Sequence, residues 1–402
     1  MKKGFIAIFI IVLVLGTILG LLSVFLTRQE INFLNKNHFS LQAYYLAESG
    51  IEDALLRIKN NPSLNNFSYS FEQGNVRVDI LENIGGVLTI VSKGEFLETV
   101  QRIKVRYQID SESISFHYGA QAGEGGIIMR NNSKIIGNVF SNGSILGGQG
   151  AEITDSVIVA GEKIDNIKIG KNAQVYSCYN SNIQEDLLYV LEESCSVGGE
   201  KELIQYIEPK DFPISEQTIN KWKSQAEQGE IIQGNYNVQG IDFLGPAHIQ
   251  GNLEVGGGSS LKLQGIILVS GDLTVYNNAV LELDPNYYQG LGGVIIVQGK
   301  TTIRPGAILR GSGLLGSYLM IISLNESLEN AVQIDNTSDA GIFYVPYGAI
   351  LLNQRVKIRE ATAYKIILRE NAVIEYEIGL QNMFFSSGAG GSWKILSWEK
   401  ID

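Results

Sequence analysis

The three histidines are the first residues to test for chemistry, because His is the commonest general base and a common metal ligand. His38, His117 and His248 are far apart in the chain, and no G-x-S-x-G nucleophile motif accompanies them. No two of them stand at the spacing of a metal site. The sequence therefore argues against a catalytic triad and a zinc centre, and we expect no metal and no cofactor.

Paired carboxylates are the remaining catalytic option, because glycoside cleavage needs only two facing Asp or Glu side chains. The candidates near expected strands are Asp272, Glu282, Asp284 and Asp335. Each has a simpler interpretation as a solvated turn or an outward strand residue. Asp284 also offers oxygens to a calcium ion, but the spacing of a calcium loop is missing. We predict that the chain is not an enzyme, with a membrane-tethered carbohydrate-active β-helix enzyme as the alternative.

Cys178 and Cys195 are the two cysteines of the chain. Both fall in the part that we expect outside the cytoplasm, where a disulfide persists. We predict a Cys178–Cys195 disulfide that closes a short segment and stabilises the fold by about 3 kcal/mol. Two separate buried thiols are the alternative, because one pair of cysteines does not form the spacing pattern of a disulfide-rich fold.

Composition bounds the elements that hold these residues. The 402 residues include 45 Gly against 7 Pro, and 45% of them are hydrophobic. Short Val, Ile and Leu runs separated by Gly, Asn and Ser are typical of many short strands joined by tight turns. The net charge of −11 argues against a phosphate-binding surface, so we expect no nucleic-acid partner.

An uncharged stretch runs from Gly4 to Thr27. A helix of about 20 apolar residues crosses the hydrocarbon core of a bilayer. Lys2 and Lys3 precede the stretch, so the positive-inside rule places the N-terminus in the cytoplasm. We expect a single-pass protein of the cell membrane with its body extracytoplasmic or on the cell surface. A cleaved secretory signal is the alternative, although its apolar core is normally shorter.

Helical spacing continues beyond the expected membrane span. Apolar residues recur through LQAYYLAESGIEDALLRIKN, and no proline follows until Pro62. One long helix over residues 1–60 is therefore expected. Its outer half needs a folded body on which to bury its apolar face.

The segments KKGFIAIFIIVLVLG and AYYLAESGIEDAL together resemble the N-terminal region of PilX-like type IV pilus assembly proteins. The resemblance covers about the first 60 residues, with a basic leader, a Gly-Phe junction and a long apolar helix. It implies that a prepilin peptidase cuts between Gly4 and Phe5. It also implies other pilin-like subunits as partners.

Phe9 departs from the pattern of major pilins, which place a Glu at the fifth mature position. In a pilus that carboxylate offsets the buried N-terminal amine of a neighbouring subunit. Phe9 cannot do so. The resemblance therefore implies a minor subunit at a tip or base.

Residues 61–115 contain alternating runs such as NVRVDIL and TVQRIKVRYQI. Alternation with period two predicts antiparallel strands with one buried face. We expect a small antiparallel sheet packed on the outer half of the helix.

A repeated seven-residue pattern begins near residue 118. It reads apolar, two variable residues, Asn or Gly, Ala or Ser, one variable residue, apolar. Its seven copies start at Met129, Ile169, Val255, Val275, Ile303, Val345 and Leu368. Asn and Gly tolerate the left-handed conformation of a tight corner, and a small residue fits inside the bend. The repeat predicts a β-solenoid, with a β-sandwich as the alternative.

Two segments, IQEDLLYVLEES and SEQTINKWKSQAEQG, break this pattern with helical periodicity. We interpret residues 180–232 as a helical insertion with one or two helices. It separates a first solenoid portion, 116–179, from a second, 233–402. The fold class is mainly β, with a long N-terminal helix, a small antiparallel sheet and an interrupted solenoid.

These predictions together describe a membrane-anchored, minor pilin-like structural and adhesive protein of a type IV pilus-like system. The expected partners are membrane lipid, other pilin-like subunits and surface carbohydrate. Exposed aromatics on the expected solenoid suit stacking on sugars, and the alternative is that they cap the ends of its core.

Overall fold

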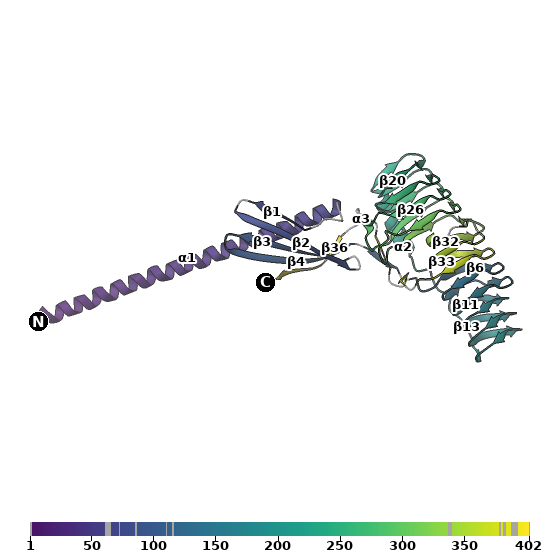
Figure 1. Ribbon diagram of the computed structural model, residues 1–402. Helices are drawn as coiled ribbons and strands as arrows, with labels where there is room; N and C mark the ends of the chain where they lie inside the picture. The colour runs from purple at the N-terminus through teal and green to yellow at the C-terminus, as the bar shows by residue number, and fades with distance from the viewer. Residues whose placement is uncertain are drawn as a thin grey trace. The chain divides into compact units, whose positions relative to one another are not determined.

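The structure is a computed structural model that describes residues 2–60, 66–71, 73–84, 87–109, 111–114, 116–336, 340–377, 379–380, 383–386 and 393–401. It is mainly β and divides into two compact units (Figure 1). The helix–sheet unit comprises Met1–Asn60, Leu64–Gln108 and Ile395–Asp402. The parallel-strand body comprises Asn61–Ser63 and Ile109–Lys394. The body therefore interrupts the sequence of the helix–sheet unit.

The helix–sheet unit contains one helix and a five-stranded sheet of order β1-β2-β3-β4-β36. Its elements are α1 (Lys2–Asn60), β1 (Phe67–Phe71), β2 (Gly74–Ile84), β3 (Val87–Phe96), β4 (Thr99–Ile109) and β36 (Trp393–Ile401). Strands β1 to β4 form antiparallel pairs, as the alternating runs predict. Val76 and Val78 of β2 are buried, and so are Ile90 of β3 and Val105 of β4.

The fifth strand of this sheet corrects the expected domain organisation. We predicted that residues 233–402 form one solenoid portion, but β36 joins the sheet beside β4. Most of the chain separates these two strands in the sequence. A local pattern does not contain that information, because strand partners are chosen by the whole fold.

The first portion of the body winds in short parallel strands from Ala120 to Leu203. Its strands are β6 (Ala120–Met129), β7 (Lys134–Ile136), β8 (Val139–Ser141), β9 (Ile145–Gly147), β10 (Glu152–Ile153), β11 (Val157–Asp165), β12 (Lys168–Ile169), β13 (Ala173–Tyr179), β14 (Asn182–Ile183), β15 (Leu187–Glu193), β16 (Ser196–Val197) and β17 (Lys201–Leu203). Successive coils pair in parallel, as β11 does with β13 and β13 with β15.

The second portion winds in the same way from Glu230 to Glu375. Its elements are β18 (Glu230–Ile232), β19 (Tyr236–Val238), β20 (Ile241–Leu244), β21 (Ala247–Ile249), β22 (Leu253–Val255), β23 (Ser260–Leu263), β24 (Ile267–Val269), β25 (Leu273–Val275), β26 (Val280–Leu283), α3 (Pro285–Tyr288), β27 (Gly293–Val297), β28 (Thr301–Ile303), β29 (Ile308–Arg310), β30 (Leu319–Ser323), β31 (Val332–Ile334), β32 (Ala340–Leu352), β33 (Lys357–Leu368) and β34 (Val373–Glu375). Its ladders are also parallel.

The two portions join in an order that the sequence does not suggest. Strand β33, near the end of the second portion, pairs in parallel with β6, the start of the first, so that Ala361 lies opposite Ala120. Strand β34 likewise pairs with β7. One apolar core therefore runs through both portions, with Ile127 and Val175 from the first and Ile295 from the second.

A second core covers the outer face of several strands. Leu268, Ile296 and Ile322 contribute to it from β24, β27 and β30. Helix α2 (Glu216–Glu227) covers them with Ile219 and Trp222. The remaining short strands, β5 (Ser111–Ile114) and β35 (Met383–Ser386), pair antiparallel with each other.

The predicted helical insertion at 180–232 is wrong for its first half. Residues 182–203 contain strands β14 to β17, which continue the first portion. Leu187 is buried in the core and pairs opposite Ala173, so the parallel ladder overrides the helical spacing of this segment. One helix, α2, forms in the second half, and the Ser215 side chain caps it by accepting the Thr218 N–H.

Five of the seven predicted corners have the expected conformation. Asn132, Gly258, Asn278, Gly306 and Asn371 have positive φ angles between 55° and 74°. In each corner the next residue, Ser or Ala, is buried, and its N–H donates to the carbonyl three residues back. The copy at Val345 is different, because β32 runs through it with a register shift between Val345 and Ala349.

Candidate assembly surfaces

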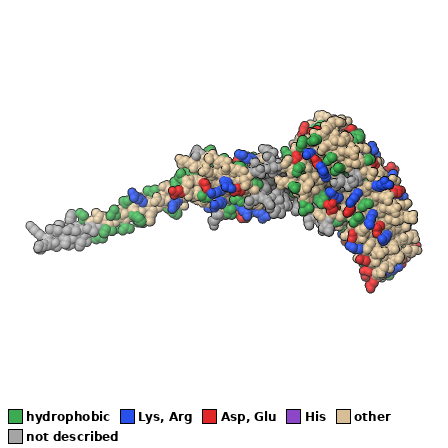
Figure 2. Space-filling model, in the orientation of Figure 1, with side chains coloured by type: hydrophobic (Ala, Val, Ile, Leu, Met, Phe, Trp, Pro, Cys, Tyr) green, Lys and Arg blue, Asp and Glu red, His purple; other side chains and the backbone are tan. Residues whose placement is uncertain are grey.

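In the first half of helix α1, the large apolar side chains that the structure describes are exposed. Its exposed large side chains include Leu19 (65% exposed), Leu21 (71%) and Phe25 (60%). Consecutive positions from 18 to 26 point in all directions around a helix, so no face of this stretch is covered. Figure 2 shows hydrophobic side chains, in green, along the extended helix. Among the described residues, no helix has the length and apolarity needed to cross a bilayer.

The predicted processing residues Gly4 and Phe5 lie outside the residues whose side chains the structure describes, and so does Phe9. The same holds for the first part of the predicted membrane span. The cleavage of Gly4–Phe5 stays a prediction.

The second half of α1 is built for close contact with the sheet. Ala43, Ala47, Gly50 and Ala54 recur at helical spacing, and the three alanines are fully buried. A Cβ atom on Gly94 of β3 would lie 2.1 Å from the Ala43 carbonyl oxygen. Small residues on both partners therefore bring the two backbones together. This is the physical role of the AYYLAESGIEDAL segment that carries the resemblance.

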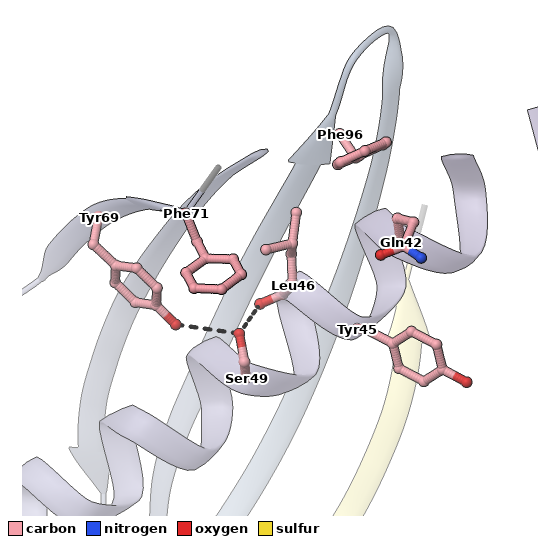
Figure 3. A pocket seen from close by; sticks show the side chains of 7 residues that line it. All are labelled: Gln42, Tyr45, Leu46, Ser49, Tyr69, Phe71 and Phe96. Atoms are coloured by element: carbon pink, nitrogen blue, oxygen red, sulfur yellow. Dashed lines mark hydrogen bonds between the residues drawn. The ribbon is translucent and has the colours of Figure 1, made fainter. Parts of the chain in front are cut away.

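An apolar pocket of about 380 Å³ lies between α1 and the sheet, and Figure 3 shows the side chains that line it. Its lining comes from α1 and from strands β1 and β3: Gln42, Tyr45, Leu46, Ser49, Tyr69, Phe71 and Phe96. The Ser49 hydroxyl donates to the Leu46 carbonyl oxygen at 2.9 Å, and its oxygen lies 3.2 Å from the Tyr69 hydroxyl. Because Ser49 has one proton, the Tyr69 hydroxyl is the donor in the second bond.

Cys178 and Cys195 form a disulfide in the structure, with a Cα–Cα distance of 6.2 Å. Cys178 lies in β13, and Cys195 immediately precedes β16. The bond therefore ties the last coil of the first portion to the coils before it. It does not close off a helical insertion, because that segment is itself part of the stack.

Two of the four candidate catalytic carboxylates lie in the coils of the second portion and have partners from the next coil. The Asp272 side chain accepts the Lys300 backbone N–H at 2.8 Å. Glu282 forms an ion pair with Arg310 at 2.6 Å. These contacts account for both carboxylates without a substrate.

The other two candidates are held in the same way by local partners. Asp284 caps α3 by accepting the Asn286 backbone N–H at 2.9 Å. Asp335 accepts from the Gln333 side chain at 3.0 Å. Each of the four carboxylates thus has a structural partner of its own.

The three histidines lie on different elements: His38 in α1, His117 just before β6 and His248 in β21. His38 and His117 are exposed, whereas His248 Nε2 lies 2.9 Å from the Ser270 hydroxyl. No group of three His, Cys, Asp or Glu residues suited to a metal occurs in the described part of the chain.

Two features of the body escaped the sequence analysis. The first is a polar ladder in which a side chain at each corner accepts an N–H from the next coil. Asn235 accepts from Asn252 at 2.9 Å, and Asn252 accepts from Asp272 at 2.9 Å. Glycine precedes each of them, and a Cβ on Gly251 or Gly271 would strike the neighbouring coil. The recurring Gly-Asn and Gly-Asp dipeptides are the sequence feature from which this ladder could have been predicted.

The second feature is a buried carboxyl group. Glu360 of β33 is fully buried, and burial raises its pKa well above the usual value. The Thr362 hydroxyl donates to Glu360 Oε1 at 2.6 Å, while Oε2 has no hydrogen-bond partner among the residues that the structure describes. A neutral, protonated carboxyl group fits this site, because an ion would lose its hydration without compensation.

The chain matches no protein-family model and no curated protein. Among solved structures, it is similar to the competence-associated pilin ComZ from Thermus thermophilus, with 13% sequence identity and a TM-score of 0.27. That alignment covers 90% of this chain and 97% of the other.

Proposed function

We propose that this chain is a membrane-anchored, minor pilin-like structural and adhesive subunit of a type IV pilus-like system. The observation that carries the proposal is the two-part construction of α1. Its outer half packs on a sheet through small residues, whereas the preceding stretch exposes apolar side chains on every face. Such a stretch requires an apolar environment, which a bilayer and neighbouring helices both supply.

We interpret the parallel-strand body as a β-solenoid that projects outside the cell. Its support is the coil-by-coil parallel pairing and the continuous apolar core. Exposed surface on such a body suits binding to surface carbohydrate or to other proteins. The structural partner of each candidate carboxylate favours this structural role over an enzyme.

Membrane anchoring is tested by charge insertion. Leu19→Asp together with Leu22→Asp should move the chain from the membrane fraction to the soluble fraction, because each charge costs about 3 kcal/mol in a bilayer. Leu97→Asp, at an exposed turn of the sheet, is the matched control. Protease added to intact spheroplasts should digest the body of the unmodified chain, and full protection would contradict the proposed topology.

Assembly is tested by the composition of purified pili. The chain should occur at trace levels beside a Glu-bearing major pilin, because Phe9 cannot neutralise a buried amine. Recovery as the dominant subunit would refute a minor role. Recovery only in bulk membrane, uncut at Gly4, would favour a separate anchored surface protein.

A further inference from the structure

The first portion of the body ends in an open strand edge. Strand β17 pairs with β15, with Leu187 opposite Lys201 and Tyr189 opposite Leu203. The described residues contain no strand in register with β17 on its other side. All three residues of β17 are exposed, and Leu203 is 69% exposed. An edge of this kind is a template for another strand.

The repeat identifies the backbone groups that this edge offers. In the preceding coils, the Ala173 N–H donates to the Asp186 carbonyl and the Leu187 N–H donates to the Glu200 carbonyl, both at 2.9 Å. The N–H of Lys201 is the next equivalent donor. The Tyr189 carbonyl accepts from Ile204, and the Leu203 carbonyl is its equivalent one coil along.

A side-chain ladder stops at the same edge. Asn172 accepts the Asp186 N–H at 3.0 Å, and Asp186 accepts the Glu200 N–H at 2.9 Å. Glu200 occupies the next position of this series. Its exposed carboxylate therefore stands where the next coil would supply a donor.

The charge of the residues around β17 indicates which kind of strand can pair with this edge. Residues 181–208 contain seven carboxylates and one Lys, a net charge of −6 out of −11 for the chain. The carboxylates are Glu185, Asp186, Glu192, Glu193, Glu200, Glu202 and Glu208. At the other end of the stack, residues 229–261 contain three carboxylates and no Lys or Arg. Like charges therefore oppose stacking of a second copy on this edge.

We propose that β17 is a docking edge for an extended, basic segment of another polypeptide, which adds to the body as a parallel strand. Backbone hydrogen bonds supply affinity, and side chains supply selectivity. The register places Lys or Arg opposite Glu200 and Glu202, and an apolar residue opposite Leu203. The inference concerns the body alone and does not depend on the pilin-like assignment.

The test uses the full chain in detergent micelles and a fluorescent peptide of sequence Gly-Ser-Lys-Val-Lys-Val-Thr-Gly. Fluorescence anisotropy should show saturable binding that weakens as salt is added, because the attraction between the charges is screened. The peptide with Glu in place of Lys should bind at least about tenfold more weakly. A peptide methylated on its backbone nitrogens should lose as much affinity, because it cannot donate to the edge.

Variants of the chain locate the site. Glu200→Lys with Glu202→Lys should weaken binding at least about tenfold, whereas Glu52→Lys at an exposed position of α1 should not change it. Lys201→Pro removes the edge N–H and should abolish binding, while Lys201→Ala should not. Circular dichroism checks folding, and the methylated peptide gives the same test if the proline variant misfolds. Equal binding of the Lys and Glu peptides, or binding unchanged by the Glu200 and Glu202 variant, would overturn the proposal.

Discussion

The helix–sheet unit and the parallel-strand body both bring backbones into close contact, but they do so with different residues. In the helix–sheet unit, Gly94 and Ala43 leave space by having little or no side chain. In the polar ladder of the body, glycine leaves space that a neighbouring Asn or Asp side chain fills, as Asn252 does beside Gly271. An added side chain should therefore be harmful at Gly94, whereas loss of a polar side chain should be harmful in the ladder.

The largest expected effect is Gly94→Val. The added side chain meets the backbone of α1, so the helix must move away from the sheet, at a cost of about 3 kcal/mol or more. Valine favours strands, so propensity does not explain a loss. Thermal unfolding followed by circular dichroism measures the effect. Gly20→Val is the control, because no described atom beyond the neighbouring turns of its own helix lies within 4 Å of its Cβ position. An unchanged melting temperature for Gly94→Val would show that the contact between α1 and the sheet does not require a glycine at this position.

Removal of the disulfide should be next in size. Cys178→Ser with Cys195→Ser should destabilise the body by about 3 kcal/mol through the entropy of the unfolded chain. Hydrogen exchange should accelerate most in residues 194–203, the last coil. Reductant should produce the same change in the unmodified chain and none in the double variant. The same hydrogen-exchange rates for residues 194–203 in the unmodified chain and in the double variant would contradict the prediction.

The pH dependence of stability should reveal Glu360. The unfolded chain releases this proton near the ordinary pKa of 4.5, whereas the folded chain retains it to higher pH. The stability contribution is therefore full below pH 4.5 and falls as pH rises toward the folded pKa, by at most about 1.4 kcal/mol per pH unit. Glu360→Gln should flatten this slope in urea unfolding measured from about pH 4 to about pH 8. The exposed Glu208→Gln should leave it unchanged, and a slope retained in Glu360→Gln would refute the assignment.

The smallest expected effect is loss of one ladder member. Asn252→Ala leaves the Asp272 N–H without its acceptor, which should cost about 1 kcal/mol. Urea unfolding measures the difference. Asn277→Ala, at an exposed position of the same portion, is the control. Equal effects of the two substitutions would show that the ladder hydrogen bond does not contribute to the stability of the body.

Local patterns predicted much of this fold. Alternation indicated the strands of the helix–sheet unit, and Asn or Gly followed by Ala or Ser marked five corners, because both signals depend on adjacent residues. Strand partners such as β36 beside β4 depend on residues far apart in the sequence. The segment around Leu187 has helical spacing, but the neighbouring coil decides its structure. The sequence around Glu360 does not predict that this residue is buried, because other parts of the fold cover the outer face on which it lies.

The pairing of β33 with β6 has a consequence for biosynthesis. Ala120 and Ala361 lie opposite each other, yet a ribosome releases the first long before the second. The edge of the first portion at β6 and β7 therefore stays unpaired until β33 and β34 have been synthesised. A chain terminated before β33 lacks the strands that pair with β6 and β7. Such a chain would keep a β edge exposed to proteases and chaperones, so the body is joined into one core only after β33 and β34 have been made.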